Sequence, residues 1–201
     1  MLLLLLFGAV KFADAQNGSV YFGLGSAYDS AAVNVTNPFT GVTANGPTLG
    51  GVFLTIGGDL MVKPKLGFGA EFSFRGNQGG YAGLNYRPLF YDFNAVYQPL
   101  GNTSNRIVPE LQGGLGGVDL KFYYPQSYCD QFAGCSNYNS YLESSHHFQV
   151  HFGGGVRVYV KGGIFVRPQV DVHWVNNFFQ FGSNWVPEYS ASVGYTFGRT
   201  P

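Results

Sequence analysis

The 201-residue sequence predicts an all-β protein: an eight-stranded antiparallel up-and-down transmembrane β-barrel. Three observations lead to this fold: apolar and polar residues alternate, eight such segments follow one another, and charged residues are scarce. Alternation with a period of two residues indicates a β-strand, because successive side chains point to opposite faces. An even number of antiparallel strands can close into a ring. Whether the apolar face points inward or outward then determines whether the barrel is soluble or spans a membrane.

The alternation is clearest between residues 164 and 174. One face is apolar and carries Ile164, Val166, Pro168, Val170, Val172 and Trp174. The other is largely polar and carries Phe165, Arg167, Gln169, Asp171 and His173. Similar stripes occur in 66–75 and 147–159, so the same division into two faces recurs along the chain.

The composition decides which face points outward. A soluble barrel would bury the apolar face, whereas a membrane barrel would turn it toward lipid. The polar stripe of the last segment contains small residues, Ser190, Ser192, Gly194 and Thr196, which suit a crowded lumen better than a soluble surface. Charged residues make up 11% of the chain and aromatic residues 17%, whereas a soluble domain is typically about a quarter charged. We therefore predict an apolar outer wall and a polar lumen.

Eight segments are expected to form strands, at about 18–28, 48–62, 66–76, 84–99, 106–124, 146–161, 164–178 and 187–198. The connectors between them alternate in length. Short connectors are expected at 63–65, 101–105 and 162–163, and longer ones at 29–47, 126–145 and 179–186. Short turns on one side of the membrane and longer loops on the other are typical of bacterial outer-membrane barrels. We expect the long connectors to face outward and the short ones to face the periplasm.

The N-terminal residues predict export. Residues 1–10 form a short apolar run, well below the roughly 20 residues that a membrane-spanning helix needs. Ala13-Asp14-Ala15 before Gln16 fits a site for signal peptidase. We expect residues 1–15 to be a signal peptide and residues 16–201 to form one β-barrel domain.

Cys129 and Cys135 fall in one polar connector between Tyr124 and Ser145. In an exported protein a disulfide between them is the simplest interpretation. Two cysteines without further cysteines or a spaced histidine pair make a weak zinc site, so we predict no metal or cofactor. The formal net charge of +0 argues against a nucleic-acid partner, which usually requires a basic patch.

Seven charged residues lie at similar heights in the expected lumen: Asp59, Glu71, Asp92, Glu110, Arg157, Arg167 and Asp171. Side chains just fill the interior of an eight-stranded barrel. Buried charges cost several kcal/mol unless they are paired. We therefore predict an ion-pair network that plugs the lumen, with a proton or ion pathway built from the same groups as the alternative. His151 and His173 are expected higher up, as hydrogen-bonded lumen residues.

Catalytic chemistry would need a nucleophile and a base. Ser144, Ser145, His146 and His147 offer these types at the start of one expected strand. Adjacent residues of a strand point to opposite faces, however, so these four side chains do not all lie on one side. The one carboxylate beside them in the sequence that could orient a base is Glu143. A polar loop is the commoner meaning of such a run, so we predict no enzyme.

The alternating strands, the leader and the closing segment from Tyr189 to Phe197 resemble the small eight-stranded outer-membrane β-barrel family. This family includes the membrane domain of outer-membrane protein A and porin-like relatives. The resemblance implies a location in the bacterial outer membrane, contact with its lipid, and a terminal signal read by the barrel-assembly machinery. Here that signal would be Tyr195 and Phe197, in the sequence Gly194-Tyr195-Thr196-Phe197.

We expect a monomer that acts as a structural element or as a binding or adhesion protein through its surface loops. Those loops are rich in Asn, Ser, Thr and Gly and in tyrosines that supply amphipathic contact area: Tyr124, Tyr128, Tyr138 and Tyr141. A small passive pore remains an alternative. So does a lipid A-modifying acyl hydrolase, since some eight-stranded outer-membrane barrels have that activity.

Overall fold

The computed structural model describes residues 17–29, 35–36, 41, 43–44, 46–81, 83–101, 105–130, 134–178 and 181–199. The signal peptide expected at residues 1–15 lies outside these ranges. Within them, no helix is both long and apolar enough to cross a membrane.

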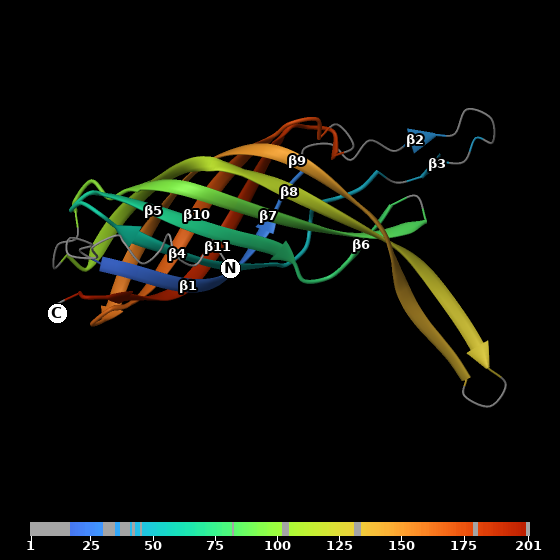
Figure 1. Cartoon of the computed structure of the whole chain (residues 1–201), viewed down its shortest axis with the longest axis horizontal. Coiled ribbons are helices and arrows are strands. Elements are labelled where there is room, and N and C mark those ends of the chain that lie inside the picture. Colours follow the sequence, from blue (N-terminus) through green and yellow to red (C-terminus); the bar gives the residue numbers. More distant parts are fainter. Residues whose placement is uncertain are drawn as a thin grey trace, which may run out of the picture.

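The described residues form eleven strands (Figure 1). They are β1 (Asn17–Ala27), β2 (Val35–Thr36), β3 (Thr43–Ala44), β4 (Phe53–Met61), β5 (Leu66–Arg75), β6 (Gly79–Tyr81), β7 (Leu84–Tyr97), β8 (Ile107–Asp130), β9 (Gly134–Lys161), β10 (Ile164–Val175) and β11 (Trp185–Phe197). Eight of them pair in the order β5-β4-β1-β11-β10-β9-β8-β7, and β5 pairs with β7 to close the ring. All pairs in the ring are antiparallel. The eight-stranded antiparallel barrel is therefore confirmed.

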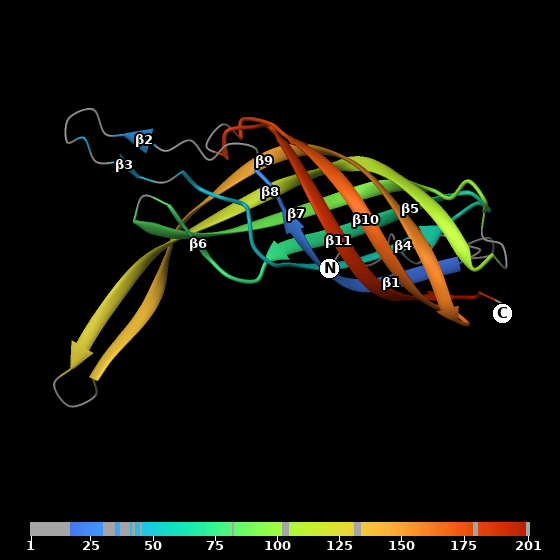
Figure 2. The ribbon, with the colours of Figure 1, turned by 180° about the vertical axis from the view of Figure 1, so that it is seen from behind.

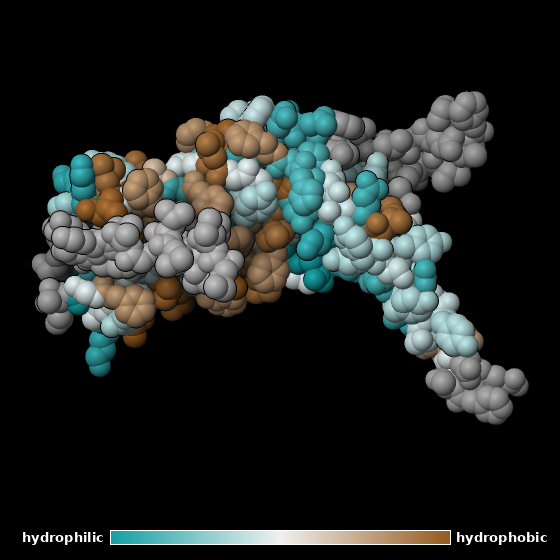
Figure 3. All heavy atoms as spheres, in the orientation of Figure 1, coloured by the Kyte–Doolittle hydropathy of each residue, from teal (hydrophilic) through white to brown (hydrophobic). Residues whose placement is uncertain are grey.

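The two faces of the wall are those that the alternation predicted. On β10, Val166 and Val170 are exposed on the outer wall, whereas Arg167 and Gln169 are buried in the lumen. Figure 3 shows hydrophobic residues spread over the barrel wall, and hydrophilic residues gathered where the wall meets the projecting hairpin. The apolar stripe faces outward, as a barrel surrounded by lipid requires.

The prediction of a long loop at 126–145 is wrong, because β8 and β9 continue through this segment as a paired hairpin. The pairing runs from Tyr124 opposite Ser140 to Asp130 opposite Gly134. Figures 1 and 2 show this hairpin projecting beyond the end of the barrel and bending away from it. A register shift between Phe122 and Tyr123 lies where the hairpin leaves the wall, and such bulges bend strands. Neither face of the hairpin is buried, so no apolar alternation marks it in the sequence.

Two expected strands are too long at their loop ends. The strand expected at 48–62 begins at Phe53, and the strand expected at 164–178 ends at Val175. Two of the residues left out, Leu49 and Phe178, are buried in the mouth of the barrel. Their apolar side chains, which resembled strand positions in the sequence, instead fill the end of the lumen.

Candidate functional site

Arg157 of β9 occupies the lumen near the short-turn end. Its Nη1 donates a hydrogen bond to Ser19 Oγ at 2.8 Å, and its Nη2 donates to Asp59 Oδ2 at 2.7 Å. The same Nη2 lies 2.5 Å from Glu110 Oε2. The guanidinium carbon also lies 4.9 Å from the centre of the Phe165 ring. The buried arginine thus has both carboxylate and aromatic partners.

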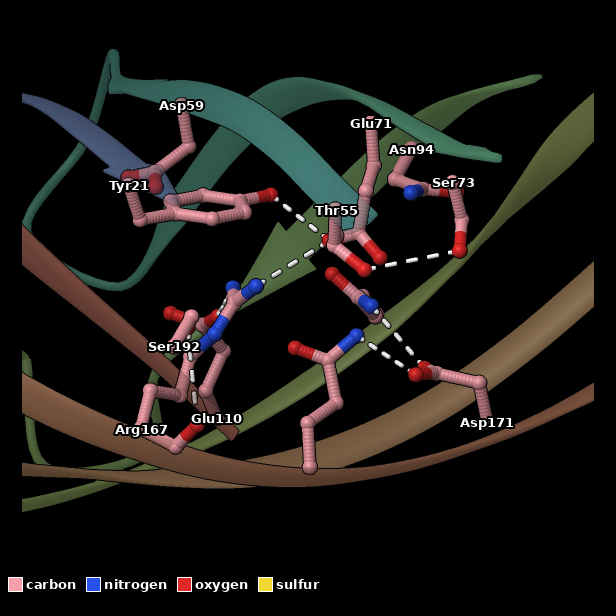
Figure 4. A network of polar contacts seen from close by, with 12 residues as sticks. Tyr21, Thr55, Asp59, Glu71, Ser73, Asn94, Glu110, Arg167, Asp171 and Ser192 are labelled. Atoms are coloured by element: carbon pink, nitrogen blue, oxygen red, sulfur yellow. Dashed lines mark hydrogen bonds and ion pairs between the residues drawn. The ribbon is translucent and has the colours of Figure 1, made fainter. Parts of the chain in front are cut away.

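Arg167 of β10 joins the next layer (Figure 4). Its Nη1 donates to Glu110 Oε1 and its Nη2 to Glu71 Oε2, each at 3.0 Å. The guanidinium carbon stacks 3.7 Å from the centre of the Tyr21 ring, and the Tyr21 hydroxyl donates to Glu71 Oε2 at 2.8 Å. Glu110 contacts both arginines, so the two layers form one connected network.

The remaining two predicted residues, Asp92 and Asp171, lie among amides and histidines. Asp171 accepts hydrogen bonds from Gln112 Nε2 at 3.1 Å and from Gln169 Nε2 at 2.7 Å. Its Oδ1 also lies 2.9 Å from His151 Nε2. Asp92 accepts a hydrogen bond from Gln149 Nε2 at 2.7 Å. Five of the seven predicted residues therefore form one network: Asp59, Glu71, Glu110, Arg157 and Arg167. The other two, Asp92 and Asp171, lie in a neighbouring layer that contains histidines.

The histidine layer contains a stacked pair, His151 and His173, with ring centroids 4.7 Å apart. His173 lies 3.8 Å from Asp92 and 3.5 Å from Glu188, which also accepts a 2.6 Å hydrogen bond from Ser73. Sequence reasoning missed Glu188. Its signal was its place two residues before Ser190 on the polar face of the last strand.

Sequence reasoning also missed Tyr21 and Gln98. Gln98 Nε2 donates to Glu110 Oε2 at 2.9 Å. The Tyr21 ring needs a glycine opposite it, because a Cβ atom at Gly57 would overlap the ring. The place of Tyr21 on the polar face of its strand could be seen in the sequence. Its partners across the lumen could not, because they depend on how the strands close into a ring.

An apolar cluster fills the lumen at the loop end. Its buried members are Ala27, Leu49, Phe53, Tyr86, Phe90, Val118, Leu120, Val175, Phe178, Phe181 and Val186. Leu49, Phe178 and Phe181 come from connectors, not from strands. A smaller apolar cluster of Tyr21, Val108, Tyr159 and Phe165 lies toward the other end. The described side chains thus fill the interior, with apolar residues toward both ends and polar residues between them.

Cys129 and Cys135 face each other across the projecting hairpin and are bonded, with an S–S distance of 2.09 Å. The disulfide expected from the sequence is therefore present. Among the described residues there is no group of three or more His, Cys, Asp or Glu side chains suited to hold a metal ion.

Tyr195 and Phe197 are exposed on the outer wall of β11 at its short-turn end. Their ring centroids are 5.0 Å apart. Their role as the assembly signal stays a prediction.

The closed ring, the apolar wall and the filled polar lumen define the class of small outer-membrane β-barrels, and comparison with solved structures agrees. The N-terminal β-barrel domain of Pseudomonas aeruginosa OprF is 10% identical with a TM-score of 0.53, and the match covers 91% of this chain and 99% of that one. Pseudomonas aeruginosa OprG is 13% identical with a TM-score of 0.53, covering 92% and 97%. Yersinia pestis Ail, solved with the heparin analogue sucrose octasulfate, is 13% identical with a TM-score of 0.50, covering 90% and 98%.

No family model and no curated protein matches the sequence. At these low identities the likeness concerns the fold, and the chain has the fold of the bacterial outer-membrane β-barrels.

Proposed function

We propose that the chain is a monomeric integral protein of the bacterial outer membrane that has a plugged lumen and acts through its β8–β9 hairpin at the cell surface. The observation that carries the proposal is the contrast between a packed interior and a projecting hairpin with exposed tyrosines. The closed ring leaves no free strand edge in the wall, which favours a monomer surrounded by lipid. The barrel-assembly machinery would insert it by reading Tyr195 and Phe197.

Three tyrosines share one face of the hairpin. The register pairs Tyr124 with Ser140, Gln126 with Tyr138 and Tyr128 with Ser136, so Tyr124, Tyr138 and Tyr128 lie on the same side. They are 53%, 51% and 61% exposed, respectively. Diagonal neighbours across two strands are about 7–8 Å apart. These three residues form an open aromatic row, here called the tyrosine face.

The opposite face of the hairpin is anchored to the barrel. Asn139 Oδ1 accepts a hydrogen bond from Asn85 Nδ2 at 3.0 Å, and Asn139 Nδ2 donates to Gln78 Oε1 at 2.7 Å. Cys129 and Cys135 alternate with the tyrosines and so lie on this same side. Anchoring on one side leaves the tyrosine face available to a partner.

The chemistry of the hairpin favours an uncharged partner. Between Lys121 and Glu143 the sequence has one charged residue, Asp130. Ail was solved with a sulfated, and therefore anionic, ligand, and sulfate groups bind best to arginine and lysine. Tyrosine rings beside Ser136, Ser140 and Gln126 suit a saccharide instead, since its C–H face packs on aromatic rings and its hydroxyls need donors and acceptors.

Replacing Tyr124, Tyr128 and Tyr138 together by serine should lower binding to the neutral polysaccharide dextran by about tenfold or more, because aromatic contacts contribute most to such surfaces. The measurement is retention of the purified protein, held in lipid nanodiscs, on immobilised dextran and on dextran sulfate. Tyr141→Ser is the matched control, because Tyr141 is exposed on the opposite face. Binding to dextran sulfate alone, or equal loss in both variants, would contradict the proposal.

The orientation is checked separately on intact cells. An epitope inserted after Ser136 of the unmutated chain should be labelled, and one inserted after Pro64, in the turn between β4 and β5, should not. Labelling at Pro64 but not at Ser136 would place the hairpin inside and remove the surface role.

A further inference from the structure

The outer wall contains a groove that crosses β8, β9, β10 and β11 and has a volume of about 590 Å³. Its lining includes three exposed side chains from three different strands and three smaller or less exposed residues between them. These are Leu111, Val170 and Tyr189, and Gly154, Val156 and Pro168. All six alternate along their strands with residues that face the lumen, so the groove opens outward.

Gly154 creates the space for this groove. A Cβ atom at Gly154 would lie 3.5 Å from Leu111 Cδ2 and 3.7 Å from the backbone oxygen of Glu110, which are ordinary van der Waals distances. At Gly153, which faces the lumen, a Cβ atom would instead overlap Asp171 Oδ1. Packing inside the barrel therefore requires Gly153 but not Gly154, and Gly154 leaves a gap in a row of outward apolar side chains.

The backbone is also irregular beside the groove. The pairing of β10 with β9 is interrupted at Arg167 and Pro168 and resumes at Gln169. Pro168 has no N–H group to donate to a neighbouring strand. The groove thus lies where the wall lacks a side chain, at Gly154, and where the β9–β10 ladder is broken.

The depth of the groove matches one leaflet of a bilayer. Gly154 precedes Lys161, at the short-turn end of β9, by seven residues. At roughly 3.3 Å per residue and a strand tilt of roughly 35–45°, this stretch rises about 16 to 19 Å. One leaflet contributes about 15 Å of a hydrocarbon core that is about 30 Å thick. An acyl chain that starts near Lys161 would therefore end in the groove.

Lys161 supplies a cation at the start of this path. It is exposed, and no ion pair of the described residues includes it. Asp59 and Glu110, toward the same end of the lumen, are buried and joined to Arg157. The turn after Lys161 is open, because a Cβ atom at Gly162 would meet nothing within 4 Å. An anionic headgroup would thus find an uncompensated charge beside bare backbone.

We propose that this strip of the wall binds one molecule of an anionic phospholipid, with the headgroup at Lys161 and an acyl chain in the groove at Gly154. Lipid tails are as apolar as the wall, so selectivity comes from the fit of the chain in the groove and from the charge of the headgroup. The assignment to the periplasmic leaflet rests on the proposed orientation of the barrel, whereas the site itself does not.

The first test ejects the barrel from nanodiscs that contain phosphatidylglycerol, which is anionic, and an equal amount of phosphatidylcholine, which is not. Native mass spectrometry should find one phosphatidylglycerol retained per barrel. Gly154→Leu should lower this retention by about fivefold or more, because the side chain fills the groove. Gly18→Leu is the matched control, since Gly18 lies on the outer wall of β1 and a Cβ atom there meets nothing closer than 3.8 Å. Heat-modifiable migration on gels confirms that each variant is folded. Equal retention by the two variants would overturn the proposal.

The second test concerns the headgroup. Lys161→Gln should lower the preference for phosphatidylglycerol over phosphatidylcholine by about fivefold, since it removes one cation beside the headgroup. Lys63→Gln removes an exposed cation from the same end of the barrel, in the turn between β4 and β5, and should leave the preference unchanged. An equal effect of both substitutions would indicate diffuse attraction by the charged rim and contradict the site, as would equal retention of the two lipids by the unmutated protein. Dextran binding and epitope labelling of the hairpin are independent of either result.

Discussion

Val170→Arg should destabilise the barrel in a bilayer by about 2 to 4 kcal/mol, which is the cost of an arginine on a lipid-facing strand near the midplane. Val170 lies on the outer wall of β10 and is 49% exposed in the isolated barrel. Its neighbour Gln169 faces the lumen, is 4% exposed, and donates a 2.7 Å hydrogen bond to Asp171. Gln169→Ala removes that hydrogen bond but puts no charge in lipid, so its effect should be far smaller, about 1 kcal/mol.

The measurement is urea unfolding of the barrel from liposomes, followed by tryptophan fluorescence. Equal destabilisation by the two substitutions would contradict the assignment of the faces. Since both residues belong to one strand, a general defect in β10 would affect them alike and is thereby distinguished from a cost specific to lipid contact.

Arg167→Ala should destabilise the barrel by about 3 to 5 kcal/mol, because it removes one partner of a buried ion pair. Arg167 neutralises Glu71 and Glu110, both at 3.0 Å, and stacks on Tyr21. After the substitution Glu110 would keep Arg157 as its arginine partner, whereas Glu71 would lose the one arginine that it contacts among the described residues. The same unfolding experiment reports the loss.

The matched control for this prediction is Arg106→Ala. Arg106 is exposed near the short-turn end and donates one 3.3 Å hydrogen bond to the backbone oxygen of Tyr159. Surface substitutions usually change stability by about 0.5 kcal/mol or less. A loss for Arg167→Ala no larger than that for Arg106→Ala would mean that the buried pairs do not hold the lumen together.

The wall of the barrel could be predicted from the sequence because lipid imposes a strict rule on one face. Every second residue of a segment such as 164–174 must be apolar, and this periodicity is visible without any knowledge of pairing. Counting residues from the short turns also predicted that Glu110, Arg157 and Arg167 lie at similar heights. Strands that are free on both faces obey no such rule, which is why the hairpin from Tyr124 to Ser140 was mistaken for a loop.

Contacts between strands could not be predicted in the same way, because they depend on register and ring closure. Glu110 meets both arginines only once β8, β9 and β10 are aligned. Leu49 and Phe178 reach the lumen from connectors, whose paths no periodicity describes.

We propose that the barrel is closed to ions and acts at its surface. Its interior contains two arginines joined to three carboxylates at the centre and a cluster of apolar side chains at the loop end. An eight-stranded barrel is just wide enough for side chains to fill it, so we expect this content to leave no room for a free channel. The competing interpretation, a small passive pore, requires the same interior to admit ions.

Planar-bilayer recording of the unmutated protein separates the two interpretations most directly. The filled lumen predicts no steady conductance at moderate voltage, while Arg167→Ala should give brief openings if water enters beside the unpaired carboxylates. Steady, large conductance from the unmutated barrel would contradict the plugged lumen and favour the pore.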